Sequence, residues 1–251
     1  MKTKIYSLFI ALIVCLNVQA IGEFNLEKAE QAYTAGEYNT ALEVYNSALD
    51  MGYESADLYY NVANCYYRKG ELAASILNYE RSLKLDPSNE DAKHNLELAQ
   101  SRTVDNIDTL GNVFFVEWWN AICNITSSNT WATVSIMLFI IALVALSLYI
   151  FVRTMWVRKL GFSVAVIALF FTIISIMSTF TRYGVETSKS AAIVFSQTVT
   201  VKSSPDSSGN DLFILHEGTK VKIKSTLGDW VEINTLDGNS GWMPANSIEV
   251  I

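Results

Sequence analysis

The chain has 251 residues, of which 51% are hydrophobic, and its formal net charge is −7 at pH 7. This acidic balance argues against nucleic acid as a partner and against docking on anionic lipid. Long apolar runs account for the hydrophobic fraction. The soluble parts are therefore small, and they hold little core for a buried active site.

The first twenty residues have the anatomy of a secretory signal peptide. Lys2 and Lys4 precede a short apolar stretch, and a small-residue cleavage pattern ends at Ala20. We expect residues 1–20 to be removed and the next segment to lie outside the cytoplasm. The alternative is a lipoprotein signal with Cys15 as the lipidated residue, although the residue before it is bulkier than such signals carry.

The remaining cysteines and the histidines form no recognisable framework. Cys65 and Cys123 leave one disulfide bond as an alternative to two free thiols. His94 and His216 are far apart in the sequence, and no Cys/His spacing typical of a metal site is present. The sequence thus predicts neither a metal nor a cofactor.

Residues 22–102 repeat themselves at a period of 34, since Gly36 recurs as Gly70 and Tyr45 recurs as Tyr79. The glycines suit the turns between paired helices, and the tyrosines suit the gap between them. A period of 34 built from two helices per unit resembles the tetratricopeptide repeat family. The expected all-α units are 22–55, 56–89 and a capping helix at 90–102.

In the tetratricopeptide family, the first helix of each unit lines a concave groove that binds peptides. The resemblance places nine positions of this chain in the groove, and its Tyr, Asn and Arg side chains are typical of peptide recognition. The alternative is that some of the tyrosines only pack between helices. One subfamily clamps a C-terminal carboxylate with Lys and Asn, and Leu26 and Glu30 at those places argue against that mode. The nine positions are Leu26, Glu30, Tyr33, Tyr60, Asn64, Tyr67, Arg68, His94 and Arg102.

The repeat pattern ends before residues 103–130, where we expect a linker. Five apolar side chains in it share one face at helical spacing, and Glu117 and Asn120 lie on another. Aromatic side chains favour the membrane interface, so this pattern predicts a short amphipathic helix on the membrane surface. The alternative is that the aromatic side chains pack on the repeats. The five are Phe114, Phe115, Trp118, Trp119 and Ile122.

Two apolar runs without a charged side chain follow at 131–152 and 160–180. Each has about the twenty residues that a helix needs to cross a bilayer, so together they predict a transmembrane hairpin. The short loop at 153–159 carries three basic side chains, and positive loops mark the cytoplasmic face. Both soluble parts are then expected in the periplasm of a bacterial inner-membrane protein.

The last segment, 190–251, consists of short alternating runs separated by Gly, Ser and Asp turns, which predicts a small all-β barrel. The Ser-rich loop at 203–210 and the strand around Trp242 make it resemble the bacterial SH3-like family. Members of that family bind cell-wall peptides, glycans or protein segments. By this resemblance, the candidate ligand contacts are Trp230, Trp242 and the loop at 203–210. The alternative is a core or half-core position for either tryptophan, and it is favoured for Trp230.

The sequence contains no nucleophile elbow, Gly-rich phosphate loop or HExxH motif, so we expect no enzyme activity. The order of parts resembles the BatE proteins of the Bacteroides aerotolerance operon. That resemblance implies partners with von Willebrand factor A domains. It favours a scaffold that assembles an envelope complex. The alternative is an anchor or sensor that binds peptidoglycan through the SH3-like barrel.

Overall fold

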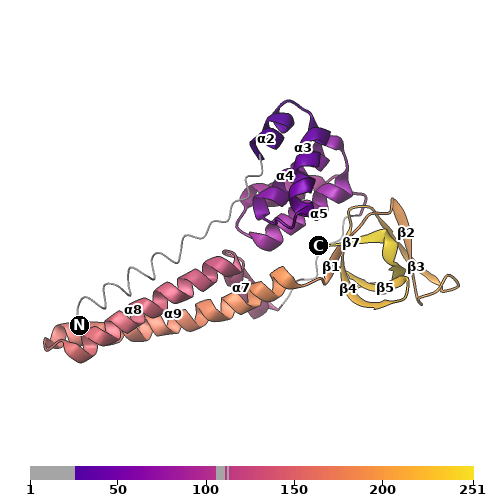
Figure 1. Ribbon diagram of the computed structural model, residues 1–251. Coiled ribbons are helices and arrows are strands. Elements are labelled where there is room, and N and C mark those ends of the chain that lie inside the picture. The colour runs from indigo at the N-terminus through magenta and orange to yellow at the C-terminus, as the bar shows by residue number, and fades with distance from the viewer. Residues whose placement is uncertain (1–25, 106–110, 112) are drawn as a thin grey trace.

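A computed structural model describes residues 26–105, 111 and 113–251 (Figure 1). The expected signal peptide at 1–20 lies outside the described residues. From Leu26 onward, a helical region is followed by two long apolar helices and a seven-stranded antiparallel sheet. This order matches the three predicted parts.

The helical region contains two antiparallel helix pairs and one further helix. The first pair is α2 (Leu26–Thr34) and α3 (Tyr38–Asp50), and the second is α4 (Ala56–Lys69) and α5 (Leu72–Leu85). α6 (Glu90–Gln100) follows, and the Asn89 side chain caps it by accepting a hydrogen bond from the Ala92 amide. Gly36 and Gly70 both have φ = 81°, which explains why glycine recurs at the turn inside each pair.

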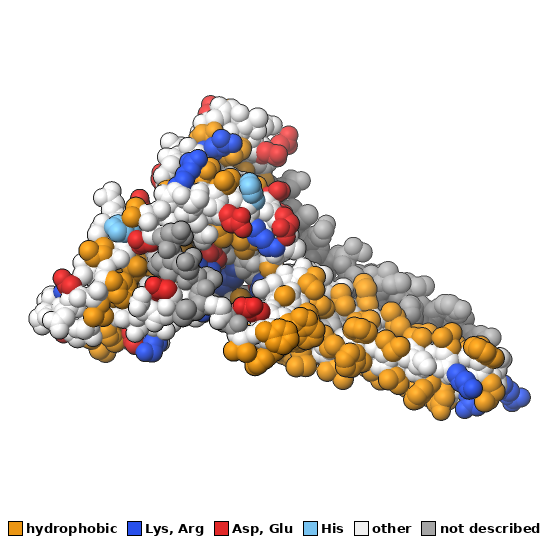
Figure 2. Space-filling view, turned by 180° about the vertical axis from the view of Figure 1, so that it is seen from behind, with side chains coloured by type: hydrophobic (Ala, Val, Ile, Leu, Met, Phe, Trp, Pro, Cys, Tyr) orange, Lys and Arg blue, Asp and Glu red, His pale blue; other side chains and the backbone are white. Residues whose placement is uncertain are grey.

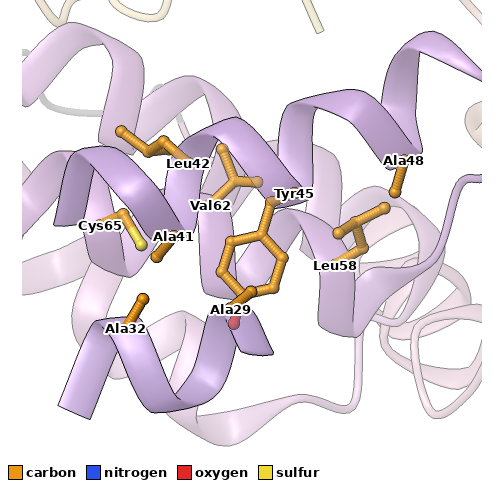
Figure 3. Packing of buried hydrophobic residues seen from close by; sticks show 9 residues of the cluster. All are labelled: Ala29, Ala32, Ala41, Leu42, Tyr45, Ala48, Leu58, Val62 and Cys65. Carbon is orange, nitrogen blue, oxygen red and sulfur yellow. The ribbon is translucent and has the colours of Figure 1, made fainter. Parts of the chain in front are cut away.

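Small side chains and one tyrosine per pair fill the interior of the repeats. Tyr45 is 3% exposed and Tyr79 is fully buried, as predicted for the gap between paired helices. In Figure 3 the ring of Tyr45 lies among alanine and aliphatic side chains from three helices. Cys65 belongs to the same cluster, and burial raises its pKa to about 11. Cys65 and Cys123 are both free thiols, so no disulfide bond joins them.

α7 (Phe114–Cys123) is the amphipathic helix predicted between the repeats and the hairpin. It packs against the second long helix, and its Cys123 is buried. Phe114, Phe115 and Trp118 are 79%, 62% and 63% exposed, so they do not pack on the repeats. Trp119 and Ile122 are partly buried, so they contribute less to the exposed apolar face of α7 than predicted.

The two apolar helices, α8 (Ser128–Phe151) and α9 (Met155–Thr187), form an antiparallel hairpin. By length and composition, both are able to cross a membrane. Hydrophobic side chains cover most of the hairpin surface in Figure 2, and Lys and Arg side chains stand at its tip. Small buried residues, including Ala142, Ala145 and Ala165, let the helices approach closely.

The hairpin turn is shorter, and its second helix longer, than the sequence predicted. The loop expected at 153–159 shrinks to three residues, because no Gly or Pro interrupts the start of α9. Arg158 secures the turn by donating to the Tyr149 carbonyl at 3.2 Å. At the other end, α9 continues past 180, where Arg182 and Glu186 pair one helical turn apart.

The C-terminal domain is a barrel-like sheet with strand order β3-β2-β6-β5-β4-β1-β7. All neighbouring strands are antiparallel. Alternate side chains of the strands point inward to form its core, among them Val201, Val231, Ile233 and Met243. The strands are β1 (Ala191–Val194), β2 (Thr198–Lys202), β3 (Asp211–His216), β4 (Lys220–Leu227), β5 (Trp230–Thr235), β6 (Ser240–Pro244) and β7 (Ile248–Val250).

The repeats and the barrel pack against each other at the end of the hairpin that is remote from its turn (Figure 1). Ile193 of β1 is fully buried in one hydrophobic cluster with Ile76, Leu77 and Tyr79 of α5. Arg81 of α5 donates to the Val250 carbonyl at 2.6 Å. The two domains therefore share part of one core.

Candidate functional site

The first part of the predicted groove is a hollow beside α2. Leu26, Glu30 and Tyr33 line it, together with Tyr45 and Asn61, and its volume is about 370 Å³. Leu26 and Glu30 are exposed, whereas Tyr33 is partly buried and packs against the core of the first pair. This hollow brings together carboxylate, phenol and amide groups, which suits the polar backbone of an extended peptide.

The second part is a hydrogen-bond network among α4, α5 and α6. Tyr79 donates its hydroxyl proton to Asn64 Oδ1 at 2.6 Å, and Asn95 Nδ2 donates to the same oxygen at 3.1 Å. Asn95 Nδ2 also lies 3.3 Å from the Tyr60 hydroxyl. These bonds hold Asn64 in one orientation, so its side-chain amide group has a fixed direction.

Two cation–aromatic pairs complete the surface. Arg68 Nε lies 3.5 Å from the Tyr33 hydroxyl, which links α4 to α2. The Arg102 guanidinium lies 4.8 Å from the centre of the Tyr67 ring. Tyr60 and Tyr67 are partly buried against the core and partly exposed, so each both packs and borders the groove.

Eight of the nine predicted positions therefore lie in neighbouring contacts along α2 and α4 and just after α6. The ninth, His94, is exposed on α6, and none of the described contacts joins it to the other eight. Asn61 and Asn95 were missed. They are related by the same 34-residue period as the predicted positions, so the repeat itself carried the signal.

The two tryptophans of the barrel lie on its outer side. Trp242 of β6 is directly opposite Glu232 of β5 and Lys202 of β2. Trp230 and Glu232 alternate with the buried residues of β5, so Trp230 shares this face. Both tryptophans are partly exposed and neither belongs to the core cluster, which fits the half-core alternative. The candidate loop at 203–210 lies beyond β2 and is closed by a bond from the Ser203 amide to the Asn210 carbonyl at 2.9 Å.

A carboxylate latch joins the segment after α6 to the barrel. Asp105 accepts hydrogen bonds of 2.7 Å from the His216 amide and from the Thr219 hydroxyl. Its other oxygen lies 2.7 Å from His216 Nδ1. Burial alone would raise the pKa of Asp105, but these hydrogen bonds together hold it below the ordinary value of 3.8.

Acidification should open this latch. The ionised form of Asp105 stabilises the docked domains at pH values above the ordinary pKa, and this stabilisation is lost as the pH falls through the lower folded-state pKa. Asp105→Asn should reproduce the loss at neutral pH, at a cost of about 1.5–3 kcal/mol. The rate of amide hydrogen exchange at residues 216–219 measures this loss of stability. Asp206→Asn is the control, because Asp206 bonds only within its own loop in the described contacts; equal exchange in both variants would contradict the latch.

Two families match the chain in separate regions. The tetratricopeptide repeat family matches residues 26–90, and the bacterial SH3 domain family matches residues 197–249. No curated protein is similar enough to the chain to count as a relative. The matched regions coincide with the helical pairs and with most of the barrel. The chain therefore carries a region similar to the tetratricopeptide repeat and a region similar to the bacterial SH3 domain.

Proposed function

We propose that this protein is a non-enzymatic, membrane-anchored scaffold that binds a protein segment in the tetratricopeptide groove. The observation that carries the proposal is that the barrel packs against α5 and leaves the groove along α2 and α4 open. In the described residues, the hydrogen bonds between the helical region and the barrel involve Glu80, Arg81, Lys84 and Asp105, and none involves a groove position. The barrel thus leaves the groove accessible to a partner.

The hairpin supplies the anchor in this proposal. Its exposed apolar surface needs a nonpolar environment, and its tip carries Arg153, Arg158 and Lys159. Positive residues at the tip favour a cytoplasmic turn, which puts both domains in the periplasm. The resemblance to BatE proteins supports partners with von Willebrand factor A domains and a role in aerotolerance.

Crosslinking in intact cells tests the groove. A photoreactive phenylalanine analogue at Tyr67 or Leu26 should capture a discrete partner, because both positions border the groove. The same analogue at Glu43, an exposed position of α3, is the matched control. Tyr33→Ala should reduce the capture at Tyr67 about tenfold, as expected for loss of an aromatic anchor. Capture that is equal at all three positions, or indifferent to Tyr33→Ala, would exclude the groove as the binding site.

The alternative function is a peptidoglycan anchor, and the outer-face position of Trp242 favours it. Aromatic side chains at a ligand face stack on sugar rings, and Trp242 is flanked by polar Glu232 and Lys202. Saturable binding of the detergent-solubilised full chain to purified peptidoglycan, lost in Trp242→Ala, would favour the anchor over the scaffold.

A further inference from the structure

A recess of about 580 Å³ lies where α5, α9 and the barrel meet. Five of its lining side chains are basic and one, Glu80, is acidic. The chain as a whole has the opposite balance, with a net charge of −7. The recess is therefore locally positive although the chain is negative, and its potential favours binding of an anion. The basic side chains are Lys84, Lys93, Arg182, Lys220 and Lys222.

Arg182 is the buried element of the recess, with only 3% of its surface exposed. Its guanidinium donates to the Lys84 carbonyl at 2.7 Å and to Asn124 Oδ1 at 3.0 Å, and lies 3.7 Å from a Glu186 oxygen. Its Nε has no hydrogen-bond partner among the described residues. A buried, unpaired donor on a cation is costly unless a ligand accepts its hydrogen bond.

The lysines of the recess differ in the hydrogen-bond and ion-pair partners that the protein gives them. Lys84 Nζ donates to the backbone oxygens of Ser188 and Ile251 at 2.5 and 2.8 Å, and burial lowers its pKa. Lys220 pairs with Glu80 at 2.7 Å. Lys222 is exposed, and it has no charged partner in the described part of the chain. A bound anion would add the counter-charge that Lys222 lacks.

The recess lies at the end of the hairpin where its apolar surface stops, on the side of the two domains. Arg182 follows the apolar run of α9 by two residues, and Asn124 directly follows α7 with its exposed Phe114 and Trp118. Aromatic side chains of this kind mark the headgroup level of a bilayer. In Figure 1 the C-terminus, which lines the recess through Ile251, stands beside α5 and β7, above the end of α9.

We propose that this recess binds the phosphate group of an anionic phospholipid at the membrane surface that faces the two domains. The inference rests on the membrane insertion that is part of the proposed function. The phosphate is held by Arg182, Lys84 and Lys222, while the acyl chains follow the apolar face of α9. The lipid then acts as a bridge between the hairpin, the repeats and the barrel.

Native mass spectrometry of the full chain in detergent tests the site. The protein is mixed with equimolar phosphatidylglycerol and phosphatidylcholine, and the bound ratio is measured. The wild type should retain phosphatidylglycerol about tenfold over phosphatidylcholine, and Lys222→Glu should lower this preference to within about twofold, since each cation near a headgroup contributes about a fivefold factor. Lys224→Glu is the control on the same strand outside the recess; because Lys224 pairs with Glu232 at 2.6 Å, this variant also shows whether a disturbed barrel alone changes the preference.

The outcomes separate the ligand sources and the two proposals. An unchanged preference in Lys222→Glu, or an equal loss in Lys224→Glu, overturns the site. Binding of inorganic phosphate as tightly as the lipid, with displacement of phosphatidylglycerol, overturns the lipid assignment in favour of a free phosphate. Carbonate washing of vesicles of the same two lipids tests the anchor independently: protein released from them refutes membrane insertion, whereas protein retained without lipid preference refutes only the recess.

Discussion

Ile193→Ala should weaken the repeats as well as the barrel. Ile193 stands in strand β1 of the barrel, yet its fully buried side chain belongs to a cluster built mainly from α4, α5 and α6. Removing three carbons from such a site costs about 2–5 kcal/mol, through lost transfer energy and a residual cavity. Hydrogen exchange of the full chain should therefore rise in α5 and in β1 together.

Ile233→Ala is the matched control for this experiment. Ile233 is the same residue type and is also fully buried, but its cluster contains only barrel residues. Its replacement should raise exchange in β4, β5 and β6 and leave α5 protected. If Ile193→Ala leaves α5 as protected as Ile233→Ala does, the two domains do not share a core, and their contact is only a surface one.

The elements of this chain could be predicted from the sequence because each has a strong local signal. The 34-residue period set the helical pairs, and Gly36 and Gly70 marked turns that require positive φ. Two runs free of charge marked the hairpin helices, and alternating residues marked the barrel. Most of the nine candidate positions also lie near one another as expected, because a repeat carries the same position from one unit to the next.

The contacts between the parts could not be predicted, because they join residues without a local pattern. Nothing near Ile193 distinguishes it from Ile233, although one meets α5 and the other the barrel interior. The latch of Asp105 with His216 spans 111 positions of sequence. The recess also has no signal in the sequence, since its five cations come from four elements and are diluted by acidic residues in the chain. The face of the barrel that holds Trp230 could not be predicted, because the two faces of a short strand alternate and the sequence does not say which face is inside.

Arg182→Leu should detach the hairpin from the repeats. Arg182 is the one side chain of α9 that, in the described contacts, hydrogen-bonds both to α5, through the Lys84 carbonyl, and to the residue after α7, through Asn124. It also faces Glu186, whose side chain is 13% exposed and accepts a bond of 2.9 Å from the Ser128 amide. Without Arg182 this carboxylate loses its cation in a mostly buried place, at a cost of about 3–5 kcal/mol.

Two further variants separate charge from geometry in this cluster. Arg182→Leu combined with Glu186→Gln removes the uncompensated carboxylate and should recover part of the lost stability, because an isolated buried charge costs more than a missing pair. Arg182→Lys keeps the charge but lacks the planar fork, so it should hold either the Lys84 carbonyl or Asn124, and not both. We therefore expect the attachment of the hairpin to the repeats in Arg182→Lys to be weaker than in the wild type and stronger than in Arg182→Leu.

Distances between spin labels on the full chain measure the detachment. Labels on cysteines introduced at Glu43 of α3 and Ser147 of α8 report the placement of the repeats on the hairpin, and both positions are exposed. The native Cys65 and Cys123 are buried and should not take the label. The distance distribution should be narrow in the wild type, broad in Arg182→Leu and intermediate in Arg182→Lys. A narrow distribution in Arg182→Leu would mean that the shared cores of the domains, rather than this arginine, fix the repeats to the hairpin.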